Sequence, residues 1–256
     1  MDDDSEALRL DSLARLISLL ESIDGSKVTL IGDTMLDRYH HGFANNLNST
    51  APVPVLKIID SDESPGASAH IAIGLTSFGM DVSFHTAVGD DAEASSITTS
   101  LKSKDIRIDN VMRVEDRPTL TKIRFFASRE SLLDRRQILL QADRGPNEIL
   151  DESVSSSLTE TALTNIPDSC ALVISDYDKG VVTKDGAQIL IKAAKSSGIP
   201  AIVDPKLTGL EKSRGATVVI FEKRGMSLLA RRIGLNDDDA AKHLLEEYSW
   251  QGILVL

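Results

Sequence analysis

Three short apolar runs in this chain each stop at an aspartate. The runs and their aspartates are Val28–Ile31 before Asp33, Ala171–Ser175 before Asp176, and Ile199–Val203 before Asp204. An uninterrupted apolar run of this length is typical of a parallel strand that is buried on both faces. The C-terminal ends of such strands meet at one edge of a sheet, where open α/β proteins bind their ligands. The pattern therefore predicts a parallel sheet with carboxylates at one crevice.

Segments with helical periodicity lie between and around these strands. Helices are expected at 1–25, 91–102, 151–164, 184–197 and at the start of 236–256, with further strands at 81–88 and at the C-terminal end. Residues 66–79 combine small and apolar residues at helical spacing, which predicts a helix packed beneath the crevice. Strands that alternate with helices indicate a doubly wound parallel α/β sheet.

Two stretches with alternating polarity do not fit that sheet. Residues 51–59 contain Pro52 and Pro54, which confine such a run to an edge strand, and residues 119–128 follow a turn signal at 116–118. We expect both to belong to a small β-lid that covers the crevice, with strands at about 40–60 and 117–128. His40–Asn48 is polar and expected to be rich in turns. The lid would be inserted into one α/β domain that spans residues 1–256.

Composition excludes several classes of protein. The chain has 256 residues, 41% of them hydrophobic, and a net charge of −11, which disfavours a nucleic-acid partner. No apolar run reaches the length of a membrane span, and the acidic, amphipathic N-terminus does not resemble a signal peptide, so the expected location is the cytoplasm. The single cysteine, Cys170, heads a predicted buried strand and is expected to be a packed thiol.

The residues at the strand ends suit a phosphorylated polyol. Asp33 and Asp37 follow the first strand, and carboxylates there accept hydrogen bonds from sugar hydroxyls or bind a cation. Asp176 is followed by Lys179, and Asp204 by Lys206, so that each of two strand ends pairs a carboxylate with an ammonium group that can hold a phosphate. The alternative is turn chemistry for the aspartates and a solvated surface role for the lysines.

Several common catalytic motifs are absent from the sequence. There is no GxxxxGK[ST] loop, no GxGxxG after a strand, no GxSxG and no HxGH. Their absence argues against P-loop kinases, Rossmann dehydrogenases, α/β-hydrolases and nucleotidyltransferases. The pair His40-His41 lacks a third ligand at a useful spacing, so no metal site is assigned.

The order of the motifs resembles that of the ribokinase/PfkB carbohydrate kinases. The segments that carry the resemblance are GDTMLDRY, APVPVLKI, SPGASAHIAIGLTSFG, AVGDDAEA, TLTKIRF, ISDYDKG and IVDPK, within residues 26–218. More narrowly, they are similar to the D-glycero-β-D-manno-heptose 7-phosphate kinase branch. The resemblance implies a ribokinase-like sheet, a lid that supports homodimers, and transfer of a phosphoryl group from Mg-ATP to the anomeric hydroxyl of a heptose phosphate in ADP-heptose synthesis.

The resemblance also implies roles for individual residues. Asp37 matches a hydroxyl-binding aspartate, and Gly66 belongs to a glycine-rich sugar loop. Lys122 and Arg124 match lid residues that reach the substrate. Lys179 and Lys206 lie in motifs where a sugar phosphate could be held.

The sequence departs from the family pattern at four places. His70 stands where a sugar-contacting asparagine is usual, Gln141 replaces a lid-side arginine, and residues 220–224 differ from the usual Thr-Pro-Asn segment. The chain also ends before the Gly-Ala-Gly-Asp motif that supplies an anion hole and a base, so no catalytic residue is assigned. We expect a C-terminally shortened and poorly active kinase. The alternative is a non-catalytic pseudokinase that binds a sugar phosphate or regulates a partner.

Overall fold

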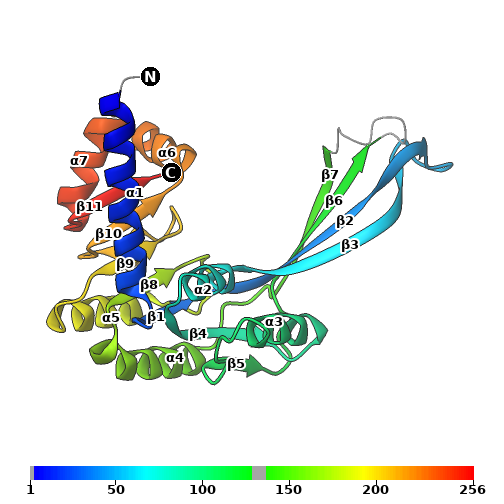
Figure 1. Cartoon of the computed structure of the whole chain (residues 1–256). Coiled ribbons are helices and arrows are strands. Elements are labelled where there is room, and N and C mark those ends of the chain that lie inside the picture. The colour runs from blue at the N-terminus through cyan, green and yellow to red at the C-terminus, as the bar shows by residue number, and fades with distance from the viewer. Residues whose placement is uncertain (1–2, 129–136) are drawn as a thin grey trace.

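The central sheet of the molecule is parallel throughout. A computed structural model describes residues 3–128 and 137–256, and within those ranges seven strands form this sheet in the order β11-β10-β9-β8-β1-β4-β5 (Figure 1). The strands are β1 (Lys27–Gly32), β4 (Asp81–Gly89), β5 (Val111–Val114), β8 (Ala171–Ser175), β9 (Ala201–Asp204), β10 (Val218–Phe221) and β11 (Gly252–Val255). The predicted doubly wound parallel sheet is therefore confirmed.

The three strands that precede an aspartate are neighbours in this sheet. Gly32 of β1 lies opposite Ser175 of β8, which in turn lies opposite Asp204 of β9. The backbone N–H of Asp33 donates to the carbonyl of Ser175 at 3.1 Å, so the chain leaves the sheet at matched positions. The common C-terminal edge that the sequence predicts is present.

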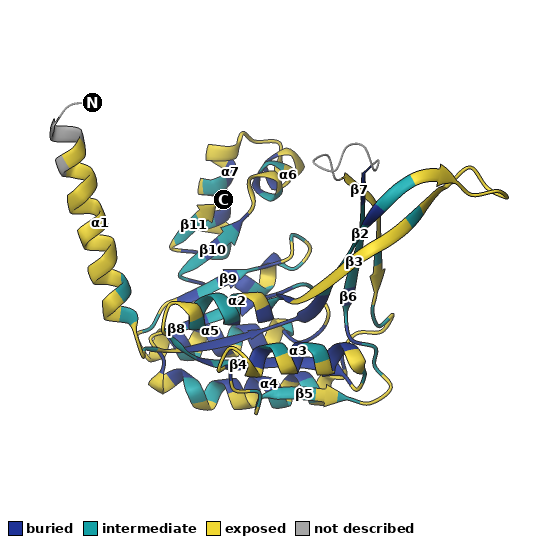
Figure 2. Cartoon of the chain, turned by 45° about the vertical axis from the view of Figure 1, so that its right-hand side comes forward, coloured by how far each residue is buried: buried dark blue, intermediate teal, exposed yellow. Residues whose placement is uncertain are grey.

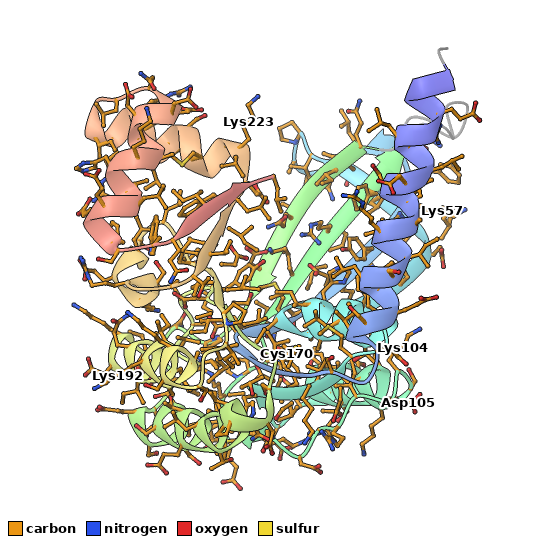
Figure 3. The ribbon with its side chains drawn as sticks, turned by 60° about the vertical axis from the view of Figure 1, so that its left-hand side comes forward. Lys57, Lys104, Asp105, Cys170, Lys192 and Lys223 are labelled. Carbon is orange, nitrogen blue, oxygen red and sulfur yellow. The ribbon has the colours of Figure 1, made fainter. Side chains whose placement is uncertain are left out.

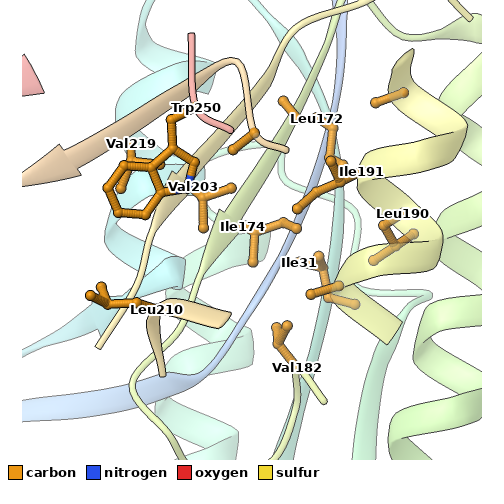
Figure 4. Packing of buried hydrophobic residues seen from close by; sticks show 14 of the residues in the cluster. Ile31, Leu172, Ile174, Val182, Leu190, Ile191, Val203, Leu210, Val219 and Trp250 are labelled. Atoms are coloured by element: carbon orange, nitrogen blue, oxygen red, sulfur yellow. The ribbon is translucent and has the colours of Figure 1, made fainter. Parts of the chain in front are cut away.

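Helices cover both faces of the sheet because consecutive strand residues point in opposite directions. Leu30 packs with α2 (Ser68–Ser77) and α3 (Ala92–Lys102) on one side. Ile31, the next residue, packs on the other side in a larger cluster (Figure 4). That cluster includes residues of α4 (Glu152–Asn165), α5 (Lys184–Ser196), α6 (Lys223–Ile233) and α7 (Asp237–Tyr248). Two short 3-10 turns, η1 (Ile166–Asp168) and η2 (Leu210–Ser213), complete the body.

A separate sheet projects from the body as the lid (Figure 1). In the described parts of the chain it has four strands in the order β3-β2-β6-β7, namely β2 (Thr34–Leu47), β3 (Pro54–Ala67), β6 (Thr121–Ser128) and β7 (Gln137–Arg144). The prediction of a turn-rich region at His40–Asn48 is wrong, because residues 40–47 belong to β2. A single residue, Asp33, separates the end of β1 from the start of β2, so Asp37 lies on the lid.

The N-terminal helix α1 (Asp3–Ile23) extends away from the body, and its described side chains are largely exposed (Figure 2). Cys170 is exposed where the chain enters β8 (Figure 3), so the expected packed thiol is wrong. Ala171, the first residue of β8, is only partly buried, and Cys170 before it is in solvent. None of the helices in the described ranges is long and apolar enough to span a membrane.

Candidate functional site

A cavity of about 390 Å³ lies where the lid meets the C-terminal edge of the central sheet. Lys122 of β6, Lys179 from the loop after β8 and Lys206 from the loop after β9 all line it. Its other lining residues are Met35, Leu120, Thr121, Asp143, Arg144, Gly145, Pro146, Asn147 and Tyr177. The structure thus brings together three lysines that are separated by up to 84 positions in the sequence numbering. We call this space the lid-side cavity.

Asp37 and Arg124 pair on the lid sheet beside this cavity. Nη1 of Arg124 donates to Oδ1 of Asp37 at 2.8 Å and to the hydroxyl of Tyr39 at 3.2 Å. Asp37 lies opposite Lys122 in the parallel pairing of β2 with β6, and paired residues share a face of the sheet. The carboxylate of Asp37 is therefore on the same lid face as the Lys122 ammonium.

Gly66 of β3 gives the Asp37 carboxylate its space. A Cβ on Gly66 would lie 2.1 Å from Oδ2 of Asp37, closer than any contact that real Cβ atoms make. Because Gly66 has no side chain, the Asp37 carboxylate can lie where it pairs with Arg124. The sequence analysis assigned Gly66 to a glycine-rich sugar loop only by resemblance, and this close approach is a structural reason for a glycine there.

Asp33 is buried and serves the loop after β8. Its Oδ2 accepts backbone hydrogen bonds from Tyr177 at 2.9 Å and Lys179 at 3.1 Å, and its Oδ1 accepts one from Val181 at 3.2 Å. Burial raises the pKa of the Asp33 carboxyl, which the Lys179 N–H opposes and the Asp176 charge reinforces. The alternative of turn chemistry describes Asp33 better than direct contact with a substrate, because its carboxylate oxygens already hold the loop that carries Tyr177 and Lys179.

Asp176 is held by a lysine that the sequence analysis did not single out. Nζ of Lys212, on η2, lies 3.0 Å from both carboxylate oxygens of Asp176, although only Oδ1 meets the geometry of a hydrogen bond. The same ammonium donates to Asp178 at 3.2 Å. Burial lowers the pKa of Lys212, but the two carboxylates outweigh that effect and raise it. The charge of Asp176 is therefore balanced by Lys212 within the protein. No pattern in the sequence predicts that these two residues pair.

A second cavity of about 400 Å³ adjoins the lid-side cavity and shares Tyr177 and Lys206 with it. Asp204, Glu222 and Arg224 also line it, at the ends of β9 and β10. Burial raises the pKa of Asp204, Lys206 lowers it, and the carboxylate of Glu222 raises it further. Helix α6 begins here without a side-chain cap from Glu222, and the N–H of its first residue, Lys223, donates to the Leu256 carbonyl at 2.8 Å. The positive end of the helix dipole lies at this cavity.

Several predicted site residues line neither cavity, namely Asp33, Asp37, Gly66, His70 and Arg124, and of these His70 has no hydrogen bond or ion pair with the residues described above. It is exposed on α2 and is not one of the lining residues. The position of its helix was predicted, but the direction of one side chain on a helix depends on packing. In the described part of the chain, no cluster of three or more His, Cys, Asp or Glu side chains could hold a metal ion by itself.

A network of charges at the base of the lid escaped the sequence analysis. Arg144 at the end of β7 lies 3.1 Å from Oε1 of Glu93, which also accepts from Nη1 of Arg38 at 3.3 Å. Asp91 lies 3.8 Å from Arg144. The Asp91 carboxylate also accepts from the Ala94 N–H at the start of α3 and from the backbone and hydroxyl of Thr119.

Comparisons with known proteins agree with this fold. The family model described as pfkB family carbohydrate kinase matches residues 26–255. The bifunctional protein HldE of Shewanella piezotolerans is 32% identical over 238 residues, which are 92% of this chain and 47% of that protein. HldE of Aliivibrio fischeri is also 32% identical and is covered over 48% of its length. The chain spans about half the length of the curated relatives it matches.

Solved structures show the same fold at lower sequence identity. Phosphofructokinase-2 from Escherichia coli in complex with fructose-6-phosphate has a TM-score of 0.65 and 19% identity, over 90% of this chain and 73% of that one. Arabidopsis thaliana ribokinase complexed with ribose and ATP has a TM-score of 0.64 and 15% identity, over 90% and 72%. The predicted ribokinase-like architecture is confirmed.

Proposed function

Because this chain belongs to the pfkB family of carbohydrate kinases, we propose that it binds a sugar phosphate in the lid-side cavity for ATP-dependent phosphorylation. The observation that carries the proposal is the convergence of Lys122, Lys179 and Lys206 on that one cavity. Ammonium groups bind phosphate strongly where they can approach it from several sides. Among the described residues that line the cavity, Asp143 is the one acidic residue beside the three lysines, so the net charge of the lining favours an anion.

The lid would hold the sugar ring of this substrate. Asp37 accepts hydrogen bonds, and its pairing with Arg124 fixes the direction of its carboxylate while Oδ2 remains beside Gly66. Sugar hydroxyls donate to such a carboxylate. Asp37 on the lid and the lysines at the sheet edge thus supply the two kinds of contact that a phosphorylated polyol requires.

The second cavity is suited to the nucleotide. The positive charge that nucleotide phosphates need would come from Lys206, Arg224 and the dipole at the start of α6. Mg²⁺ is commonly bound through one or two carboxylates together with substrate phosphates, and Asp204 and Glu222 would hold it here. A bound Mg²⁺ supplies charge neutralisation for the phosphates. Tyr177 and Lys206, which both cavities share, would then lie between donor and acceptor.

The relatives named HldE favour a heptose 7-phosphate as the substrate, phosphorylated at its anomeric hydroxyl on the way to an ADP-heptose. In such a transfer the anomeric oxygen bonds to the γ-phosphorus while the bond from that phosphorus to the β–γ bridging oxygen breaks. ADP leaves, and the hydroxyl proton passes to a base. We assign that base to no residue of this chain.

The lid would also pair with a second copy, as the family resemblance implies. Exposed apolar side chains on the lid support this, namely Leu47, Val53, Val55, Ile58, Ile59, Ile138, Leu139 and Leu140. Light scattering of the purified chain tests it, because a mass near 27.7 kDa would show a monomer and contradict the pairing.

Calorimetry and phosphorus NMR test the proposed function in two separate steps. Titration of the chain with D-glycero-D-manno-heptose 7-phosphate is expected to release or absorb heat with a saturable profile, and no binding of any sugar phosphate would overturn the proposal. Addition of Mg-ATP to the complex then tests transfer, since a kinase produces a second sugar-phosphate resonance and ADP. Binding without transfer would favour the non-catalytic, sugar-phosphate-binding alternative.

A further inference from the structure

Lys179 lies in a loop whose backbone conformation is unfavourable by itself. The residues on either side of it, Asp178 and Gly180, have φ angles of 59° and 103°. A positive φ brings the Cβ of any residue other than glycine close to its own backbone, so the conformation of Asp178 costs free energy. Contacts from the rest of the protein must therefore hold this loop, which carries one of the three lysines of the lid-side cavity.

Two side chains hold the backbone of Lys179, one at its N–H and one at its carbonyl. Oδ2 of Asp33 accepts from the N–H at 3.1 Å, and Nη2 of Arg117 donates to the carbonyl at 2.9 Å. Arg117 comes from the loop between β5 and β6, just before the lid begins its third strand in the chain. Because each residue has one backbone donor and one backbone acceptor, the peptide units on both sides of Lys179 are fixed.

Arg117 also joins this loop to a second segment of the cavity wall. Its Nη1 donates to the carbonyl of Glu148 at 3.1 Å, directly after residues 145–147, which line the lid-side cavity. The two segments approach closely at Gly180, where a Cβ would lie 2.6 Å from the backbone nitrogen of Leu150. A guanidinium has several N–H donors in a rigid fork, so it can hold both carbonyls at once.

The backbone of Arg117 is itself fixed against the body. A Cβ on Gly89, the last residue of β4, would clash with the Arg117 carbonyl oxygen, so the two segments are in close contact. Arg117 does not line the lid-side cavity, and the space that it shares with Asp33 and Lys179 has about 10 Å³, the lower limit for one water molecule. Arg117 can therefore affect a ligand in the lid-side cavity only through other residues.

We infer that Arg117 is a positioning residue for phosphate binding, because its hydrogen bond to the carbonyl of Lys179 fixes the point from which that lysine reaches the lid-side cavity. This inference rests on the proposed function, in which Lys179 binds the phosphate of the sugar. A lysine side chain is long and flexible, so an anchored backbone limits the positions that its ammonium group samples. The loop before β6 then contributes to the affinity for the substrate without touching it.

The alternative is that Arg117 only stabilises the two loops and affects binding independently of Lys179. A double-mutant cycle distinguishes these roles, because residues that act through one another have effects that do not add. Arg113 on β5 is the matched control. Its side chain is 41% exposed, pairs with Asp90 and lines neither cavity.

Calorimetric titrations with heptose 7-phosphate measure the cycle. We expect Lys179→Gln and Arg117→Gln each to weaken binding by about 10-fold, and the double variant by no more than about 20-fold, whereas independent effects would multiply to about 100-fold. Arg113→Gln should change the affinity by less than about twofold. Losses that multiply in the double variant would overturn the inference, as would the absence of a loss in either single variant.

Arg117→Lys provides a second variant for the same cycle. It keeps the positive charge but can no longer hold both carbonyls in a rigid fork, so it should recover only part of the affinity that Arg117→Gln loses. If Arg117→Gln does not fold, as judged by circular dichroism, Arg117→Lys takes its place in the cycle. Its loss should then disappear when Lys179 is replaced by glutamine, and a loss that persists would contradict the inference.

Inorganic phosphate, titrated in the same way, separates a failure of this inference from a failure of the proposed function. If the chain binds inorganic phosphate with coupled effects of Arg117 and Lys179 but binds no sugar phosphate, the proposed function fails and the positioning role stands. If it binds the sugar phosphate and the two effects multiply, the proposed function stands and the inference fails. If it binds neither ligand, both are wrong.

Discussion

The ammonium of Lys206 lies over the ring of Tyr177, 5.0 Å from its centroid, and this pair lines both cavities. An aromatic face attracts a cation over this distance and restrains it. Burial raises the pKa of the Tyr177 hydroxyl, as do the carboxylates of Asp204, Asp37 and Glu222, so the ring remains neutral at physiological pH. Lys206 is thus held where an anion in either cavity can reach it.

Lys206→Gln should therefore weaken the binding of two ligands. We expect the affinity for heptose 7-phosphate and that for ADP each to fall by roughly 10-fold, because each loses a charged donor. Separate calorimetric titrations measure the two effects, and Lys192→Gln, which alters an exposed lysine on α5 (Figure 3), is the control. A loss confined to one ligand would show that Lys206 serves one cavity only.

Gly66→Ala should impair sugar binding without unfolding the lid. The new Cβ would displace the Asp37 carboxylate, which is the free end of a side chain and can move, and the contact of Asp37 with Arg124 would be lost. We expect the affinity for the sugar phosphate to fall by about 10-fold or more. Gly74→Ala in α2 is the matched control, because a Cβ at Gly74 meets nothing within 4 Å. Unchanged affinity in Gly66→Ala would contradict a role of Asp37 in binding.

Lys212→Met should destabilise the fold strongly. The Asp176 side chain has no exposed surface and the Lys212 side chain is 14% exposed, so the change would leave a buried carboxylate without its cation. The free energy of unfolding should fall by about 3–5 kcal/mol, as measured by urea denaturation. Lys184→Met removes an exposed ion pair with Glu211 and should cost less than about 1 kcal/mol. Similar costs for the two variants would refute the role assigned to Lys212.

His85 should make stability depend on pH. Burial lowers the pKa of His85 from 6.5 to about 4. Between those values the unfolded chain binds a proton that the folded chain does not, so the free energy of unfolding rises with pH across this window. The contribution, on the order of 3 kcal/mol, is present above pH 6.5 and is lost as the pH falls toward 4.

Denaturation of His85→Gln at a series of pH values checks this assignment. Glutamine does not titrate, so the variant should lose most of the slope between pH 4 and 6.5 that the unaltered chain shows. The absolute stability can also fall, because His85 contacts Ser83 and Thr161 through its two ring nitrogens. An unchanged slope would assign the pH dependence to other groups.

The central sheet was predictable because its strands are buried on both faces. Burial requires an apolar run, and a parallel arrangement forces the ends of β1, β8 and β9 to one edge, so Lys179 and Lys206 could be placed together from the sequence. The helices α3, α4, α5 and α7 were predictable for a related reason, since capping residues and periodicity mark their ends.

The lid was predicted only in part because partner strands rather than burial define it. Nearly every residue of β7 is exposed, and its apolar residues, Ile138–Leu140, are consecutive and do not alternate with polar ones as in a half-buried strand. Its pairing with β6 makes it a strand. The polar half of β3 is also exposed, and its pairing with β2 makes it a strand. Lys212 was missed because it lies on a short turn 36 residues from Asp176, and only the folded chain brings the two together.

One carboxylate joins the lid to the start of a helix. Asp91 caps α3 through the Ala94 N–H at 2.9 Å and also accepts from the backbone N–H of Thr119, just before β6, at 2.9 Å. A tilt of the lid that draws Thr119 away would pull on the same carboxylate that protects the Ala94 amide from solvent. Opening of the lid would therefore increase the rate of hydrogen exchange at the Ala94 amide, which lies on the α/β body, so no probe on the lid itself is needed.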